Sequence, residues 1–208
     1  MRKIILIQHC QSEHHINNLT GGWTDTPLTD LGQKQANLLG TKLKNEISTE
    51  EYTLYSSDLL RAKQTADIID NYLNLGVIEE FGLREINNGI AAGKTKDWVK
   101  ENEIPMPEES FNIDHEAFLG GETWRQFFLR VSKSMEDIYS LNRKNLIIVT
   151  HGCALSYIIA WWLKLTPEML NYTVFSASPA SISMLLEGRF NQRVLRILND
   201  TSHLTKLS

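Results

Sequence analysis

Short apolar runs alternate along the chain with longer segments in which apolar residues recur every three or four positions. The runs KIILIQ, YTLYSS and NLIIVT, at residues 3–8, 52–57 and 145–150, are short and apolar or strand-like, and they predict strands. The first is rich in isoleucine on both alternating faces, which is typical of a buried parallel strand. A shorter strand is expected within residues 76–85.

The longer periodic segments predict helices. They cover residues 27–46, 58–73, 122–141 and 151–165, with Thr29 as the N-cap of the first. Leu31 and Leu60 are among the core candidates of the first two helices. Residues 181–188 and 193–199 predict a closing pair of strands around the Gly188 turn.

Residues 86–120 are rich in glycine and proline and predict an irregular lid or cap, with one short helix near residues 94–101. The rest of the pattern alternates strands with helices. We therefore expect an α/β fold: a single-domain three-layer α/β/α sandwich over residues 1–208 with a mostly parallel central sheet.

Polar side chains follow the predicted strands at the point where each strand ends. In open α/β sheets, ligands bind at the carboxyl ends of the strands. That rule brings His9, Ser57 and His151 to one rim, joined by Arg61 from the next helix and Glu85 from a loop. Two histidines, an arginine and a carboxyl group can transfer a phosphoryl group through a histidine: one imidazole attacks, the cation holds the oxygens, and the acid protonates the leaving oxygen.

A series of motifs extends over nearly the whole chain in a fixed order. They are QHCQS, GWTDTPLTDLGQKQA, SSDLLRAKQTA, LREINNG, GGET, THG and NDTSHL. In this order they resemble the histidine phosphatase superfamily, in its phosphoglycerate-mutase-like branch. The resemblance implies the phosphoglycerate-mutase-like fold, with His9 as the phosphorylated nucleophile, Arg61 as a phosphate ligand, Glu85 as the general acid and His151 as a stabiliser of the transferring group.

Three positions around the nucleophile depart from that family. Gln8 replaces its arginine, Cys10 its glycine and His15 its asparagine. A neutral hydrogen bond contributes less than a charged one, so losing one such contact would slow the enzyme about tenfold per 1.4 kcal/mol. His15, if protonated, would restore charge near neutrality and favour mildly acidic pH. Together with Arg61 and Gly22, Gln8 and His15 are the predicted phosphate- and substrate-binding residues.

Cys10 and Cys153 flank the two rim histidines, and three interpretations stay open. They are packing residues, or an oxidation-sensitive pair that approaches across the pocket, or soft-metal ligands with His14 or His15. Free cysteines are commonly buried, which favours the packing interpretation of Cys10 and Cys153. His14 is expected to be solvated. The histidine mechanism requires no metal and no organic cofactor.

Composition limits the partners. The net charge is −4, so no overall basic field would attract nucleic acid or an acidic membrane. The longest lipophilic stretch, residues 154–165, is too short to span a bilayer. We expect a cytoplasmic protein with reduced thiols and a small phosphorylated substrate, and a homodimer is left open.

Hydrolysis is favoured over mutase activity. Only four cations, Lys94, Lys96, Lys100 and Arg125, stand among eight acidic residues between positions 86 and 125. A mutase needs several cations around a small sugar acid. The apolar residues of this segment suggest a partly apolar leaving group; they are Trp98, Ile104, Met106, Phe111 and Phe118. Gln8 leaves open a weakened or inactive relative that binds phosphorylated ligands without turnover.

Overall fold

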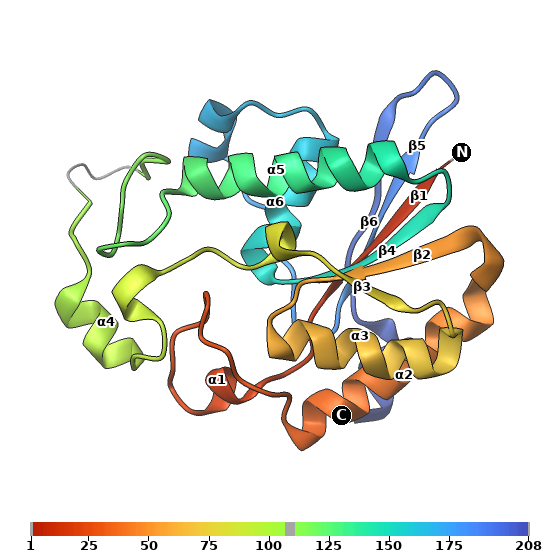
Figure 1. The fold of residues 1–208 in the computed structure, drawn as a ribbon, viewed down its shortest axis with the longest axis horizontal. Coiled ribbons are helices and arrows are strands. Elements are labelled where there is room, and N and C mark those ends of the chain that lie inside the picture. The colour runs from red at the N-terminus through yellow and green to blue at the C-terminus, as the bar shows by residue number, and fades with distance from the viewer. Residues whose placement is uncertain (1, 107–110, 208) are drawn as a thin grey trace.

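The computed structural model describes residues 2–106 and 111–207, and a six-stranded sheet forms the centre of that part of the chain (Figure 1). The strand order is β3-β2-β4-β1-β5-β6. The strands are β1 (Lys3–Gln8), β2 (Tyr52–Ser56), β3 (Val77–Glu79), β4 (Asn145–Thr150), β5 (Ile182–Glu187) and β6 (Arg193–Asp200). β1 to β4 are parallel to one another, and β5 and β6 are antiparallel additions. The mostly parallel sheet is confirmed.

Helices cover both faces of this sheet (Figure 1). They are α1 (Glu13–Ile16), α2 (Asp30–Glu46), α3 (Leu60–Leu73), α4 (Lys96–Asn102), α5 (Trp124–Leu141) and α6 (Gly152–Trp162). Successive side chains of β1 point to opposite faces. Ile4 and Leu6 therefore pack in the core under α5 and α6, whereas Ile5 and Ile7 pack in the core under α2 and α3. This gives the three layers that the pattern predicted.

The start of α2 shows how local sequence sets the helix. The Thr29 hydroxyl accepts a hydrogen bond from the Gly32 amide at 3.0 Å, which confirms the predicted N-cap. Gly32 faces inward, and a Cβ there would lie 1.9 Å from the Gln11 carbonyl oxygen, so only glycine allows the close approach. Because Gly32 occupies the inward position, Leu31 is turned outward and is 38% exposed. The expectation of a buried Leu31 was wrong.

Two further sequence-based expectations concern the middle of the chain. Leu60 is only half-buried, and the preceding Leu59 takes the core position at the start of α3. The short helix expected near residues 94–101 is α4, and its N-cap is Thr95, which accepts from the Trp98 amide at 3.1 Å. The use of residues 86–120 as a lid stays a prediction, and residues 107–110 lie outside the described part.

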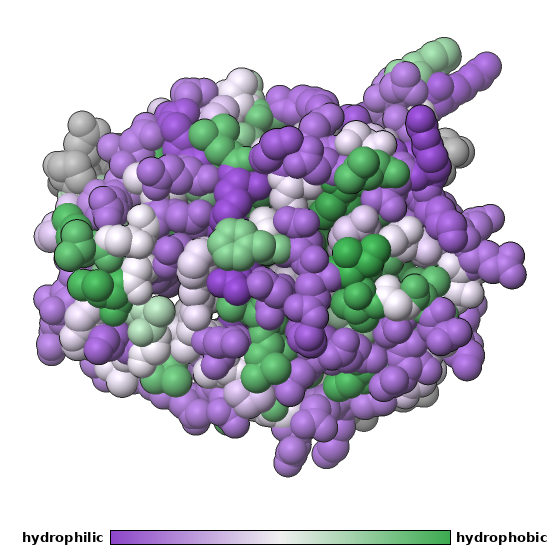
Figure 2. All heavy atoms as spheres, viewed as in Figure 1, coloured by the Kyte–Doolittle hydropathy of each residue, from purple (hydrophilic) through white to green (hydrophobic). Residues whose placement is uncertain are grey.

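The surface is mostly hydrophilic. Figure 2 shows a face on which polar residues dominate and hydrophobic residues form separate small groups. Among the described residues, no helix is both long enough and apolar enough to cross a membrane.

Candidate active site

The structure brings the predicted rim residues together at the carboxyl ends of β1, β2 and β4. The rings of His9 and His151 lie 5.0 Å apart between centroids. The Arg61 Nε donates to His9 Nε2 at 3.2 Å, and the His151 Nε2 lies 2.8 Å from the Ser57 hydroxyl. The His9 amide also donates to the Thr150 carbonyl at 2.8 Å, which ties the end of β1 to the end of β4.

The hydrogen bonds of His9 define which ring nitrogen can react. Its Nδ1 lies 2.8 Å from the Cys10 carbonyl oxygen, which can only accept, so Nδ1 carries the hydrogen. Nε2 therefore keeps its lone pair and faces Arg61. Burial, and then the charge of Arg61, hold the pKa of His9 well below its ordinary value. At neutral pH the ring is an unprotonated nucleophile.

Arg61 is the permanent cation of the site, and its side chain is almost fully buried. Its two terminal nitrogens donate to the Thr24 and Gly22 carbonyls, each at 2.7 Å. Burial lowers the pKa of Arg61 to about 10, so it stays charged at neutral pH. Three of its five N–H groups are used within the protein, which leaves two for phosphoryl oxygens.

Gly22 has a role that the sequence did not indicate. Its carbonyl positions Arg61, and its backbone has a left-handed φ of 57°. A Cβ at this position would lie 2.9 Å from the Ile86 carbonyl oxygen. Glycine is therefore required to bring this loop over the guanidinium. The proposed contact between Gly22 and substrate stays a prediction.

The Glu85 carboxyl group lies beside the first turn of α6. Its carboxyl oxygens accept from the Ile86 amide at 3.0 Å and the Cys153 amide at 2.9 Å. Desolvation raises the pKa of Glu85 above its ordinary value, although these amides and the charge of Arg61 oppose the shift. The raised pKa favours the protonated form that a general acid needs.

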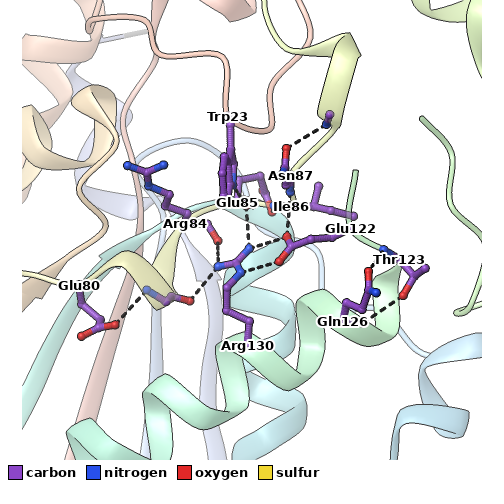
Figure 3. Close-up of polar contacts among 12 residues, drawn as sticks. Trp23, Glu80, Arg84, Glu85, Ile86, Asn87, Glu122, Thr123, Gln126 and Arg130 are labelled. Carbon is purple, nitrogen blue, oxygen red and sulfur yellow. Dashed lines mark hydrogen bonds and ion pairs between the residues drawn. The ribbon is translucent and has the colours of Figure 1, made fainter. Parts of the chain in front are cut away.

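The loop that carries Glu85 is held by Arg130 of α5, a residue that sequence reasoning missed (Figure 3). Its guanidinium donates to the carbonyl oxygens of Gly82, Arg84 and Glu85, each at 3.1 Å. It also forms a bidentate ion pair with Glu122, both bonds being 2.7 Å long. The GGET motif that contains Glu122 was the available signal.

Two further hydrogen bonds hold the same loop. The Trp23 indole donates to the Glu85 carbonyl at 2.8 Å, and Glu122 accepts from the Asn87 amide at 2.9 Å (Figure 3). The backbone on both sides of the acid is thus fixed by side chains from three parts of the chain.

Gln8 is buried beside the start of α6. A Cβ on Gly152 would lie 3.5 Å from the Gln8 Oε1, and that oxygen has no hydrogen-bond partner among the described residues. Rotating the Gln8 side-chain amide by half a turn would place its NH₂ group where Oε1 lies. Gln8 can therefore offer neutral donors to an anion where the family has a charged one.

His15 differs from the sequence-based expectation. The Ser12 amide donates to its Nδ1 at 3.0 Å, so the neutral ring carries its hydrogen on Nε2. Burial, followed by the charges of Arg61 and Lys96, lowers the pKa of His15. The lowered pKa argues against the expectation that it titrates near neutrality and supplies charge. His15 instead presents a neutral N–H donor, as an asparagine amide does.

His14 is also not the solvated residue that was expected. It is 7% exposed, because its ring packs against His15 at 4.0 Å between centroids and its Nδ1 lies 2.8 Å from the Ser12 hydroxyl. Burial, and then His15, lower the pKa of His14 to about 3. Both histidines are therefore neutral at pH 7.

His9, His14 and His15 could together hold a metal ion, since one ring nitrogen of each lies within 4.8 Å of the others. The hydrogen bonds oppose this use. The lone pair of His9 Nε2 faces the Arg61 cation, and the His15 lone pair accepts from Ser12. A bound metal ion would have to displace the Arg61 and Ser12 donors to reach these lone pairs.

The two cysteines belong to different cores. Cys10 packs under α2 and α3, and Cys153 packs with the core under α5 and α6. Both are free thiols, and burial raises the pKa of Cys10 to about 12. Because the two thiols pack in cores on opposite faces of the sheet, they are poorly placed to form a redox pair or to bind one metal ion together. The structure supports the packing interpretation.

Comparisons with known proteins agree with this geometry. The model of the histidine phosphatase superfamily (branch 1) matches residues 4–201. A 2,3-bisphosphoglycerate-dependent phosphoglycerate mutase of Allorhizobium ampelinum is 31% identical, over 80% of this chain and 82% of its own length. Phosphoserine phosphatase 1 of Hydrogenobacter thermophilus is 30% identical, over 98% and 95%.

Solved structures are similar as well. The phosphoserine phosphatase of Entamoeba histolytica in complex with 3-phosphoglyceric acid superposes with a TM-score of 0.78 at 25% identity, covering 98% of this chain and 100% of that chain. The alpha-ribazole phosphatase of Shigella flexneri has a TM-score of 0.80 at 24% identity, covering 95% and 96%, and shares the fold.

Replacing Arg130 tests how the acid loop is held. Arg130→Ala removes donors from three carbonyls and leaves Glu122 unpaired, so we expect the free energy of unfolding to fall by about 3 kcal/mol. Urea denaturation measures this. The matched control is Arg125→Ala, whose partners Asp114 and Glu168 are exposed, and which should change stability little. Equal effects of the two variants would refute the assigned role.

Phosphate binding tests the neutral donor of His15. Calorimetric titration with inorganic phosphate at pH 7 should show about fivefold weaker binding for His15→Ala and a smaller loss for His15→Asn, which keeps an N–H donor. Because burial, and then the charge of Arg61, lower the pKa of His15, its ring should stay largely neutral from pH 7 to pH 8. Wild type and His15→Asn should then share one pH dependence, and a rise in affinity toward acid found only in wild type would contradict the neutral assignment.

Proposed function

The chain belongs to the histidine phosphatase superfamily (branch 1), and we propose that it hydrolyses phosphomonoesters of small metabolites through a phosphohistidine. The observation that carries the proposal is the His9 Nε2 lone pair, which is buried, unprotonated and directed at the Arg61 guanidinium. A nucleophile beside a fixed cation is the arrangement that phosphoryl transfer to nitrogen requires.

The reaction has two displacements. In the first, His9 Nε2 attacks phosphorus, the bond from phosphorus to the ester oxygen breaks, and protonated Glu85 gives its proton to the leaving alcohol. In the second, ionised Glu85 takes a proton from water, the water oxygen attacks phosphorus, and the bond between phosphorus and nitrogen breaks. Phosphate leaves, and His9 and Glu85 return to their initial states.

His151 is suited to stabilise the transferring group. Ser57 accepts from the Leu59 amide at 3.3 Å and can donate its hydroxyl hydrogen to His151 Nε2 at 2.8 Å. This places the ring hydrogen of His151 on Nδ1, a buried atom with no partner among the described residues. Such an unpaired donor is costly unless a ligand accepts from it, and a phosphoryl oxygen would do so.

The few cations available to a substrate favour hydrolysis over mutase activity. One permanent cation, Arg61, serves as the phosphate ligand, and Gln8 stands where the family has a second arginine. Arg125 is bonded to Asp114 and Glu168 and is not available to a substrate carboxylate. A ligand-binding relative without turnover is less well supported, because such a relative would not need all four of His9, Arg61, Glu85 and His151, and all four are present.

The first test uses 4-nitrophenyl phosphate with and without a chelator. We expect slow turnover that survives the chelator, disappears in His9→Ala and persists in His115→Ala, a control histidine whose Nε2 is hydrogen-bonded to the Ile104 carbonyl. Loss of activity with the chelator would contradict a metal-independent mechanism. Absence of turnover between pH 5 and 8, with phosphate still bound, would identify a phospho-ligand-binding protein instead.

Leaving-group dependence tests Glu85 as the general acid. Glu85→Gln should lower kcat/KM for an alkyl phosphate by about 10²–10⁴-fold and for 4-nitrophenyl phosphate much less, since nitrophenolate leaves without a proton. The pKa of Glu85 is raised and the protonated form is the active one, so wild-type activity on the alkyl ester should fall as pH rises through that pKa. A uniform loss on both esters would exclude the assignment.

A further inference from the structure

An apolar cavity lies directly beside the candidate acid. Its volume is about 340 Å³, within the usual range of small-molecule pockets. Cys153 and Tyr157 of α6, Trp124 of α5 and Val174 form part of its wall. Because the Cys153 amide also donates to the Glu85 carboxyl at 2.9 Å, one residue joins the cavity to the acid.

No described residue that lines this cavity carries a charge. Arg125, next to Trp124 in the chain, is bonded to Asp114 and Glu168. A substrate carboxylate placed in the cavity would lose its water without gaining a charged partner. The lining therefore selects against acidic alcohols and favours apolar ones.

Two hydrogen bonds hold the wall of the cavity together. The Ile113 amide donates to the Asn171 side chain at 3.1 Å, and the Phe175 amide donates to the Ser156 hydroxyl at 2.9 Å. These bonds tie the segment after α6 to the segment before α5 and to α6 itself. A preformed apolar wall avoids an ordering cost on binding.

Aromatic rings line the cavity and continue to its rim. Trp124 and Tyr157 meet edge to face at 6.1 Å between centroids, and Phe111 lies 5.8 Å from Trp124. At the rim, Tyr172 is 90% exposed and Val174 is 78% exposed. Exposed apolar groups beside a concave apolar wall are typical of a binding site.

We propose that this cavity is the leaving-group subsite, and that the substrates are phosphomonoesters of uncharged aromatic or aliphatic alcohols. The inference rests on the proposed function, since the phosphoryl group must lie at His9 and the ester oxygen at Glu85. From that oxygen the carbon skeleton passes Cys153 and enters the apolar wall. This substrate class differs from the acidic substrate named in the phosphoserine phosphatase relative.

The test compares chain length in two assays. Calorimetry with n-alkylphosphonates from methyl to hexyl reports binding alone, and hydrolysis of the matching n-alkyl phosphates reports catalysis. Each added methylene should raise affinity and kcat/KM up to about fourfold until the cavity is filled. Phosphoserine and 3-phosphoglycerate should be poorer substrates than butyl phosphate.

Variants locate the effect. Val174→Asp places a carboxylate at the rim and should lower affinity for hexylphosphonate about tenfold while leaving methylphosphonate unchanged. Leu141→Asp is the control, since this exposed leucine ends α5 and Trp124 begins it. A length series that is flat in both assays, or an equal loss in both variants, overturns the subsite. Length-dependent binding without hydrolysis supports the subsite and overturns the proposed hydrolysis instead.

Discussion

The buried guanidinium of Arg61 is the constraint on which the rest of the site depends. A charge removed from water must be compensated by hydrogen bonds, and the Thr24 carbonyl, the Gly22 carbonyl and His9 Nε2 supply them. A left-handed backbone at Gly22 accompanies the contact of its carbonyl with Arg61, and the lone pair of His9 Nε2 is directed at the Arg61 Nε–H. Burial first, and the charge of Arg61 after it, lower the pKa values of four neighbouring histidines, so these rings are neutral beside the cation.

This charge distribution explains how the site can operate with Gln8. One buried cation faces a phosphate dianion, and the other contacts come from uncharged N–H groups of His15, His151 and the Gln8 amide. Neutral donors contribute less than charged ones, which is the physical reason to expect a slower enzyme. Desolvation raises the pKa of Glu85 and so favours its neutral form. In that form Glu85 does not repel the incoming phosphate anion until it has given up its proton.

Local signals were sufficient for much of the fold and for the rim, and insufficient wherever a contact joins distant segments. The isoleucine run of β1 and the Thr29 cap could be predicted because each depends on neighbours in sequence. Burial of His14 depends on packing against His15 and on the Ser12 hydroxyl in a four-residue helix too short to show a period. The reach of Arg130 to the Glu85 loop crosses more than forty positions and leaves no periodic trace.

The position of α6 links chemistry to selectivity. Residues four apart in a helix share one face, so Cys153, which holds the acid, and Tyr157, which lines the apolar cavity, lie one above the other. Further parts of the wall come from Phe111, from Trp124 of α5 and from residues 170–174, and no hydrogen bond joins these residues to the side chains of His9 or Arg61 in the described part of the chain. Changes in those segments can therefore alter which alcohol is accepted without moving the nucleophile, the cation or the acid. Such a separation between the proposed phosphoryl site and an apolar wall would let the accepted alcohol change while the chemistry stays the same.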